Sequence, residues 1–269
     1  MGLIQKFTDV VANTGVKHYP DRSINSGTKA VFDVGAGGVF GGAKNVASGN
    51  LIYSLTFSDS SATFSKPHTY ENGGMVFAGV GGDQFNLPAV ASPYAADKHW
   101  LVTMWLKIAN FGVGTAGVNN QTFSFSTSDI NVLTAVTLGM SITAVAGASP
   151  SSIAVYVRGK FYTITLPATP LFDGSVHQFA LECEVSADNT QQRVFVYLDQ
   201  IQVYASGWAA VAATIPTDPT YRYVGTSPAF PKAWSGIFYR YRKDDLTTTS
   251  KSTAQILADD LDVASGRFS

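Results

Sequence analysis

Hydrophobic and polar residues alternate along much of the chain after residue 50. Between Trp100 and Ile108, apolar side chains occupy every second position. The same alternation returns over residues 179–185 and again over residues 194–198. A period of two places successive side chains on opposite faces of a β-strand. These segments are therefore predicted to be strands of a sheet that has one apolar and one polar face.

Turn signals separate these strands. Residues 153–157 and 161–166 flank Arg158-Gly159-Lys160, a short connection with a glycine that is typical of a β-hairpin. Clusters of Ser, Pro, Thr and Asp at residues 148–152 and 216–219 mark further turns. Many short strands separated in this way indicate a sandwich of two sheets.

One short helix is expected near the C-terminal end. Ser252 and Gln255 have the spacing of a capping box, in which the two side chains satisfy the first backbone amides of a helix. The apolar residues Ile256, Leu257 and Leu261 follow at helical spacing. The sequence therefore predicts a capped helix that begins just after Ser252.

The first 48 residues differ from the rest. Apolar side chains recur there at helical spacing, and residues 35–43 are rich in glycine; the apolar residues are Leu3, Ile4, Phe7, Val10 and Val11. One interpretation is an extended arm, residues 1–48, that reaches a neighbouring molecule and precedes a sandwich domain of residues 49–269. The other is an ordinary first strand with a loose loop.

Several segments, taken in order, resemble the laminin-G-like branch of the concanavalin A-like lectin and glucanase family. They are residues 74–85, 100–107, 173–181, 194–199, 223–225 and 235–241. The resemblance covers about residues 50–262. It implies an all-β, two-sheet jelly-roll β-sandwich, here with an N-terminal arm and a short C-terminal helix.

The chain departs from the family pattern at three places. Val176 stands where the family usually has Trp, Gln200 replaces the Gly after Asp199, and no acidic residue follows Ser235-Gly-Ile. Without that Gly, the hairpin at Asp199 is not expected to be an ideal type I′ turn. The fold hosts lectins, glycosidases, adhesion modules and virion proteins, so the resemblance predicts a fold and leaves the function open.

Charge and composition narrow the function classes. Charged residues make up 14% of the chain and the net charge is −1, which argues against a nucleic-acid partner. A single cysteine forms neither an internal disulfide nor a cysteine-rich zinc site. No apolar stretch approaches the length of a membrane span. Lys6 and Asp9 interrupt the segment where a secretory signal would be apolar, so we expect synthesis in a host cytoplasm.

Glu182 and Glu184 are the best candidates for a catalytic pair. They lie two positions apart on one strand, so both carboxylates face the same side. Glycoside hydrolysis uses two such groups, and the related glucanases add a third acid on the same strand. Here the next acid, Asp188, falls in a predicted turn. The pair is therefore interpreted as solvated, and the chain is expected not to be an enzyme.

The histidines and the cysteine suggest structural roles. His18, His68, His99 and His177 form no local pair with zinc-ligand spacing. His177 matches a structural strand position of the family, and Cys183 is predicted to be a small buried hydrophobe.

The resemblance makes calcium a candidate ligand, because laminin-G-like and lectin relatives bind it through loop oxygens. The candidate ligands Asp83, Asp129 and Asp199 form no local run of alternating acids. Gly81-Gly82 lacks the Lys-Ser/Thr that would follow in a phosphate loop and is interpreted as a tight turn. We assign no catalytic, cofactor or metal residue, and no cofactor is expected.

Two aromatic segments are candidates for ligand contact. Residues 238–244 combine three aromatic and three basic side chains. Strand alternation predicts Tyr239 and Tyr241 on one face, with Phe238, Arg240 and Arg242 on the other. They would either stack on a sugar or polyanion, or place the tyrosines in the core and the arginines in solvent. Trp208 is the best candidate for an exposed aromatic, with capping of the sandwich as the alternative.

Taken together, the profile favours a structural protein of a bacteriophage virion. The main hypothesis is a capsid decoration (cement) protein on the particle surface, held through its arm by other virion proteins and by copies of itself as a homo-oligomer. A tail, collar or baseplate component is the second. The alternative from another class is a lectin-like carbohydrate-binding module, for which a surface glycan is the partner.

Overall fold

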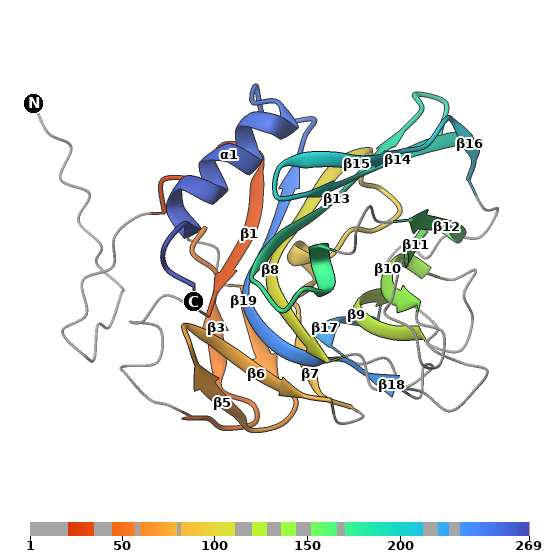
Figure 1. Cartoon of the computed structure of the whole chain (residues 1–269). Coiled ribbons are helices and arrows are strands. Elements are labelled where there is room, and N and C mark those ends of the chain that lie inside the picture. Colours follow the sequence, from red (N-terminus) through yellow and green to blue (C-terminus); the bar gives the residue numbers. More distant parts are fainter. Residues whose placement is uncertain are drawn as a thin grey trace, which may run out of the picture.

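The computed structural model describes residues 21–34, 45–56, 60–79, 82–110, 120–127, 136–143, 152–165, 170–211, 220–225 and 232–268. Within these ranges the chain forms two facing β-sheets and one α-helix (Figure 1). The predicted all-β sandwich with a short C-terminal helix is confirmed.

The first sheet contains ten of the described strands. Its order is β15-β14-β13-β8-β19-β6-β5-β2, with β1 beside β19 and β16 beside β14. The long strand β19 pairs with β8 along one side and with β6 and β1 along the other. The bounds are β1 Thr28–Asp33, β2 Asn45–Val46, β5 His68–Glu71, β6 Gly74–Ala78, β8 His99–Asn110, β13 His177–Val185, β14 Gln191–Leu198, β15 Ile201–Ala205, β16 Ala209–Ala210 and β19 Ser235–Asp245.

The second sheet contains nine of the described strands, in the order β12-β11-β10-β9-β17-β7-β4-β3, with β18 beside β9. Two short 3-10 helices, Ala89–Ala91 and Pro170–Phe172, lie between strands. The strand bounds are β3 Leu51–Tyr53, β4 Ser61–Phe64, β7 Gln84–Asn86, β9 Asn120–Thr127, β10 Val136–Thr143, β11 Ser152–Val157, β12 Lys160–Thr165, β17 Tyr221–Gly225 and β18 Lys232–Ala233.

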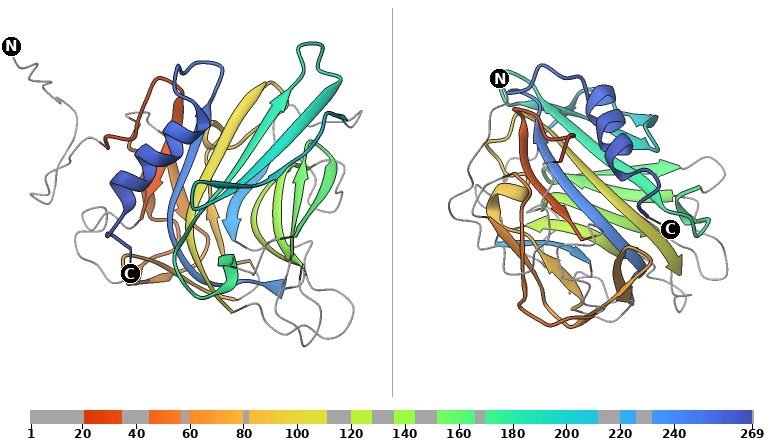
Figure 2. Two further views of the ribbon diagram at one scale, coloured as in Figure 1. Left: turned by 45° about the horizontal axis from the view of Figure 1, so that its top comes forward. Right: turned by 90° about the vertical axis from the view of Figure 1, so that its left-hand side faces the viewer.

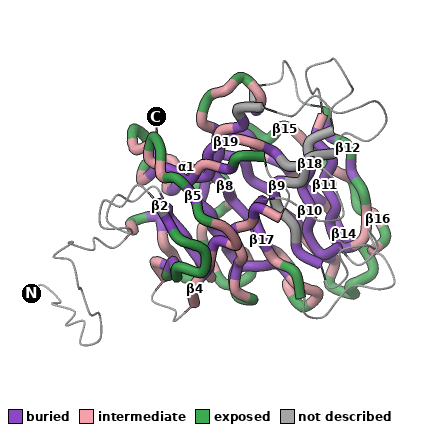
Figure 3. The backbone as a smooth tube through the Cα atoms, turned by 90° about the horizontal axis from the view of Figure 1, so that it is seen from below, coloured by how far each residue is buried: buried purple, intermediate pink, exposed green. Residues whose placement is uncertain are grey.

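The main core lies between the two sheets. The residues expected there are buried, namely Met104, Phe179, Leu181, Val194 and Val196 at 0% exposure, and Trp105 at 5%. Figure 3 shows buried backbone running through the central strands of both sheets, with much of the exposed backbone in the connecting turns. Trp105 differs from the others because its side chain packs on the outer face of the first sheet.

The helix α1, Thr253–Ala264, explains why side chains on the outer face of the first sheet, such as Trp105, are also buried. Its capping box is confirmed, because the Ser252 hydroxyl accepts from the Gln255 amide while the Gln255 side chain accepts from the Ser252 amide. Ile256 and Leu257 pack on Leu101 and Ala180 of the first sheet. Figure 2 shows that α1 lies across the outer face of this sheet. Strands β8 and β13 are therefore buried on both faces. The prediction that their second face is polar and solvated is wrong wherever α1 covers it.

A β-bulge in β19 changes the predicted alternation of the aromatic and basic run. Tyr239 and Arg240 together oppose Trp105, so the pairing with β8 shifts by one residue. Phe238 and Tyr241 consequently belong to the core between the sheets, whereas Tyr239 belongs to the outer layer with Trp105. The expected shared face for Tyr239 and Tyr241 is wrong, because a bulge inserts an unpaired residue and reverses the facing of those that follow.

Two hairpins show how turn chemistry acts here. Arg158 and Gly159 have positive φ angles of 48° and 77°, which is the pattern of a type I′ turn. Asp199 and Gln200 show the same pattern, at 49° and 69°. The missing Gly therefore does not prevent a type I′ turn. Gln200 adopts the left-handed conformation, which is unfavourable for a residue with a Cβ.

Part of the predicted arm belongs to the sandwich. Residues 28–33 form β1, in which Ala30, Val31 and Phe32 are fully buried. These residues match the first-strand interpretation. Residues 1–20 and 35–44, which include the apolar and glycine-rich segments of the arm hypothesis, lie outside the described residues. Within the described part of the chain, no helix combines the length and the apolar character needed to cross a membrane.

Candidate functional site

The aromatic and basic run in β19 forms a buried charge network. The Arg240 side chain is fully buried, and its guanidinium contacts Asp21 at 2.7 Å, Asp33 at 2.6 Å and Asp260 at 2.9 Å. Burial alone would lower the pKa of Arg240, but these carboxylates raise it, so the charge is retained. Asp260, on α1, also accepts a hydrogen bond from Trp105 Nε1 at 2.7 Å.

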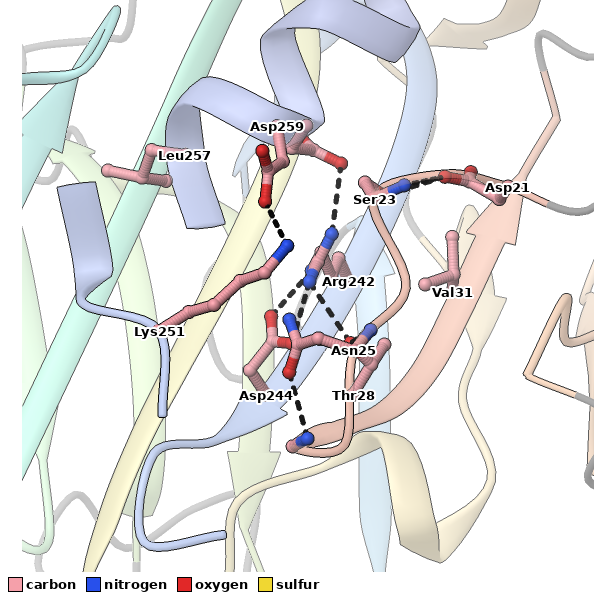
Figure 4. Close-up of polar contacts among 12 residues, drawn as sticks. Asp21, Ser23, Asn25, Thr28, Val31, Arg242, Asp244, Lys251, Leu257 and Asp259 are labelled. Carbon is pink, nitrogen blue, oxygen red and sulfur yellow. Dashed lines mark hydrogen bonds and ion pairs between the residues drawn. The ribbon is translucent and has the colours of Figure 1, made fainter. Parts of the chain in front are cut away.

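Arg242 extends the same network towards the N-terminal segment. Its Nε donates to Asp244 at 2.6 Å and its Nη2 to the Thr28 hydroxyl at 3.0 Å. Figure 4 shows Arg242 among residues of β1, β19 and the helix region. Both expectations for Arg240 and Arg242 are wrong, because their charged heads are neither in solvent nor open to a ligand: acids from three elements enclose them.

Glu182 is also engaged within the protein. Its carboxylate interacts with His99 Nε2 at 2.7 Å and accepts from the hydroxyls of Tyr197 at 2.8 Å and Thr253 at 2.9 Å. Burial raises the pKa of Glu182, but these hydrogen bonds outweigh it and the net pKa lies below its ordinary value. The interpretation of Glu182 as solvated is wrong, because α1 supplies Thr253 and covers this part of the sheet.

His177 lies between two acids at the start of β13. Nδ1 is 2.8 Å from Asp199 and Nε2 is 3.0 Å from Asp173. Burial lowers the pKa of His177, yet hydrogen bonds to both acids give a net rise. Asp199 also accepts from the backbone amide of Gln178, so this group ties the turn after β14 to β13. Cys183 is fully buried, as predicted, and burial raises the pKa of its thiol to about 12.

The two calcium candidates within the described residues pair with different histidines. Asp83 pairs with the buried His68 at 2.7 Å, Asp199 pairs with His177, and Asp129 and His18 lie outside the described residues. Among the residues that the structure describes, no group of three or more His, Cys, Asp or Glu side chains is arranged to hold a metal ion. Gly82 has a φ of +74°, in keeping with a turn, while Gly81 lies outside the described residues.

Trp208 lies in the connection between β15 and β16, both of which pair with β14 in the first sheet. It is 44% exposed. The Arg193 guanidinium lies over its ring, 4.8 Å from the centroid, and 5.3 Å from the centroid of Phe195. A Cβ added at the neighbouring Gly207 would meet no atom of the described residues within 4 Å. Trp208 is thus an exposed aromatic, as its candidacy for ligand contact requires.

Glu184 holds Arg193 in place. The two residues are directly paired between β13 and β14, and the Arg193 Nε and Nη2 lie 2.6 and 2.5 Å from the same oxygen, Glu184 Oε2. Both side chains remain partly exposed, at 28% for Glu184 and 38% for Arg193. Within the described part of the chain, Glu184 Oε1 and Arg193 Nη1 have no hydrogen-bonding partner.

We call Glu184, Arg193, Phe195 and Trp208 the Trp208 cluster. It offers an indole ring, one spare acceptor and one spare donor on an uncovered surface. Apolar ring faces with a few fixed polar groups are what ligand sites provide. Sequence reasoning selected Trp208 and Glu184 separately but missed Arg193 and Phe195. The alternation in β14, which places these two on the outward face, was the signal that could have found them.

No protein-family model matches the sequence, and no curated protein is similar to it in sequence. Solved structures share its fold. A Trypanosoma rangeli sialidase in complex with sialic acid superposes with a TM-score of 0.55 at 12% identity, over 90% of this chain and 33% of the sialidase chain. The chain therefore spans about a third of that protein.

Domain 4 of AbnA, a GH43 extracellular arabinanase from Geobacillus stearothermophilus in complex with arabinotriose, gives a TM-score of 0.45 at 12% identity, over 88% of this chain and 99% of that domain. The CBM40 of the Ruminococcus gnavus IT-sialidase gives 0.43 at 11% identity, over 68% of this chain and 96% of that domain.

Proposed function

We propose that this protein is a lectin-like carbohydrate-binding module and that the Trp208 cluster is its glycan site. The observation that carries the proposal is the combination of an indole that is 44% exposed with an arginine and a carboxylate that each keep one polar atom available. A sugar ring has an apolar C–H face and a rim of hydroxyls. The first packs on an aromatic ring and the second pairs with polar side chains.

The similarity in fold to a protein that was solved with a bound sugar supports this proposal. The Trypanosoma rangeli sialidase, whose fold the chain shares in part, was solved with sialic acid. Because the likeness is one of fold, it assigns no residue, and the site is argued from the Trp208 cluster alone.

The other hypotheses stay predictions. The hypothesis of attachment to a phage particle depends on the arm, and its apolar residues Leu3, Ile4 and Phe7 lie outside the described residues. The virion location, the homo-oligomer and the expectation that the chain is not an enzyme also stay predictions. Glu182 and Glu184 are engaged by hydrogen bonds and by an ion pair, respectively.

A glycan array tests the proposed function. Wild-type protein, Trp208→Ala and Tyr221→Ala would be compared on the same panel. Tyr221 is a matched control because it is also 44% exposed but lies on β17 of the other sheet. We expect specific binding by the wild type and by Tyr221→Ala, with a loss of at least about fivefold for Trp208→Ala, since stacking on one aromatic contributes of the order of 1 kcal/mol or more.

Two results would contradict the proposal. One is the absence of glycan binding by folded wild-type protein. The other is binding that Trp208→Ala retains in full, which would place the glycan elsewhere on the molecule.

A further inference from the structure

Among the residues that the structure describes, carboxylates outnumber permanent cations around the Trp208 cluster. Glu184 and Glu182 lie on the same face of β13, and Asp188 lies in the turn that joins β13 to β14. Against these three carboxylates stand, among the described residues, the permanent cations Arg193 and Lys98, of which Lys98 contacts Asn189 in the same turn. His99 lies opposite Glu184 on β8, and its Nε2 contacts Glu182 at 2.7 Å.

Arg193 does not offer a free positive charge. Two of its nitrogens already contact one carboxylate oxygen of Glu184, which lies directly across the strand pair. Asp188 stays ionised as well, because hydrogen bonds from Ser186 and Thr190 lower its pKa to about 2. An arriving anion would therefore meet an arginine whose charge is already compensated and a carboxylate beside it.

The two polar atoms still available have opposite hydrogen-bonding character. Arg193 Nη1 donates and Glu184 Oε1 accepts, and both belong to one ion pair beside the indole. A hydroxyl both donates and accepts, so two adjacent hydroxyls satisfy this pair. A carboxylate only accepts and would leave Glu184 Oε1 facing a like charge.

We propose that the Trp208 cluster takes a neutral sugar residue through two adjacent hydroxyls and discriminates against acidic sugars. The inference rests on the proposed function and adds the class of ligand. Within it, Trp208 supplies the stacking surface and Arg193 donates to one hydroxyl. Glu184 accepts from the other hydroxyl and also provides the charge that disfavours sialic and uronic acids.

Matched sugar pairs test this directly. Methyl glucoside and methyl glucuronide differ only at C6, which is a hydroxymethyl group in the first and a carboxylate in the second. Methyl galactoside and methyl galacturonide form a second such pair. Dissociation constants would be measured by titration while the four tryptophan indole N–H signals are followed. For the wild type we expect at least one neutral hexoside to bind, with the matching uronide about tenfold weaker or more at low salt.

Glu184→Gln sharpens the test because it keeps the shape of the side chain and removes its charge. We expect the ratio between the two sugars to fall at least about fivefold, since Arg193 then becomes uncompensated. Tyr221→Ala should keep the wild-type ratio. Unchanged signals from the buried tryptophans would show that the variant is folded.

Each outcome decides a different claim. If the uronide binds as tightly as the neutral sugar, or more tightly, and Trp208→Ala abolishes that binding, the ligand class is wrong while the proposed function stands. If the ratio does not change in folded Glu184→Gln, Glu184 is not the discriminating group and the inference fails. If no sugar of the pairs or of the array binds, the proposed function and this inference both fail.

Discussion

The outer face of the first sheet carries two clusters that contain the same three kinds of side chain. Under α1, Trp105, Arg240 and Asp260 are joined by hydrogen bonds of 2.7 and 2.9 Å and are almost completely buried. In the Trp208 cluster, Arg193 lies over the Trp208 ring and pairs with Glu184, and all three side chains stay partly exposed. Residue type alone therefore does not separate a structural cluster from a candidate binding site.

The cover provided by α1 makes the difference. A buried charge needs a partner, and Arg240 has three acids around it. Gln178 adds a hydrogen bond of 3.2 Å to Asp260, so the covered cluster is occupied by its own protein. In the open cluster one donor and one acceptor are left over, at the cost of a weaker contribution to stability.

The largest effect is expected from removing the covered arginine. Arg240→Met would leave Asp21, Asp33 and Asp260 buried without their shared cation. We expect the free energy of unfolding to fall by about 3–5 kcal/mol, measured by urea denaturation. Arg193→Met is the matched variant in the open cluster, where the loss should stay below about 1 kcal/mol. Equal losses for the two variants would remove the distinction between the clusters.

The helix cap tests the cover itself. Ser252→Ala removes the side chain that accepts from the Gln255 amide. We expect a loss of about 1 kcal/mol in the free energy of unfolding. Ser250→Ala is the control, because Ser250 is exposed and precedes the helix. A cap that contributes nothing would be revealed by indistinguishable thermal transitions for the two variants.

A pH-dependent effect is expected at the boundary between the two regions, where Glu182 lies. Its pKa in the folded protein is below its ordinary value of 4.5, so between these two pKa values the unfolded chain binds more protons. The stability due to its charge is therefore present above pH 4.5 and is lost as the pH falls through the lower pKa. Denaturation of wild type and Glu182→Gln across pH 3–7 should show a difference that shrinks on the acidic side. A constant difference would contradict this origin.

The smallest effect concerns the hairpin that joins β14 to β15 in the open region. Gln200 has a φ of +69°, which glycine adopts at little cost. We expect Gln200→Gly to raise the free energy of unfolding by about 0.5 kcal/mol, since relief of the left-handed conformation exceeds the added chain entropy. Thermal denaturation measures it, and a clear destabilisation would mean that the Gln200 side chain makes a stabilising contact.

The sequence predicts correctly those features that have a local cause. The capping box of Ser252 and Gln255, the hairpin at Arg158-Gly159 and the buried positions of β8 depend on neighbouring residues. It failed where distant segments meet. Trp105 and Asp260 are 155 positions apart, and nothing near either residue indicates that α1 will cover β8. The bulge at Tyr239 has no local signature either, so the alternation places Tyr239 on the same face as Tyr241, which is wrong.

The measurement that tests the central claim most directly follows the four tryptophan indole N–H signals while the sugar selected by the array is added. Trp100, Trp105 and Trp234 are buried and Trp208 is 44% exposed. The Trp105 signal therefore reports on the covered cluster and the Trp208 signal on the open cluster. The account predicts a saturable shift of the Trp208 signal, with the Trp105 signal unchanged. Saturable binding that leaves Trp208 unmoved, or that moves Trp105 instead, would contradict it.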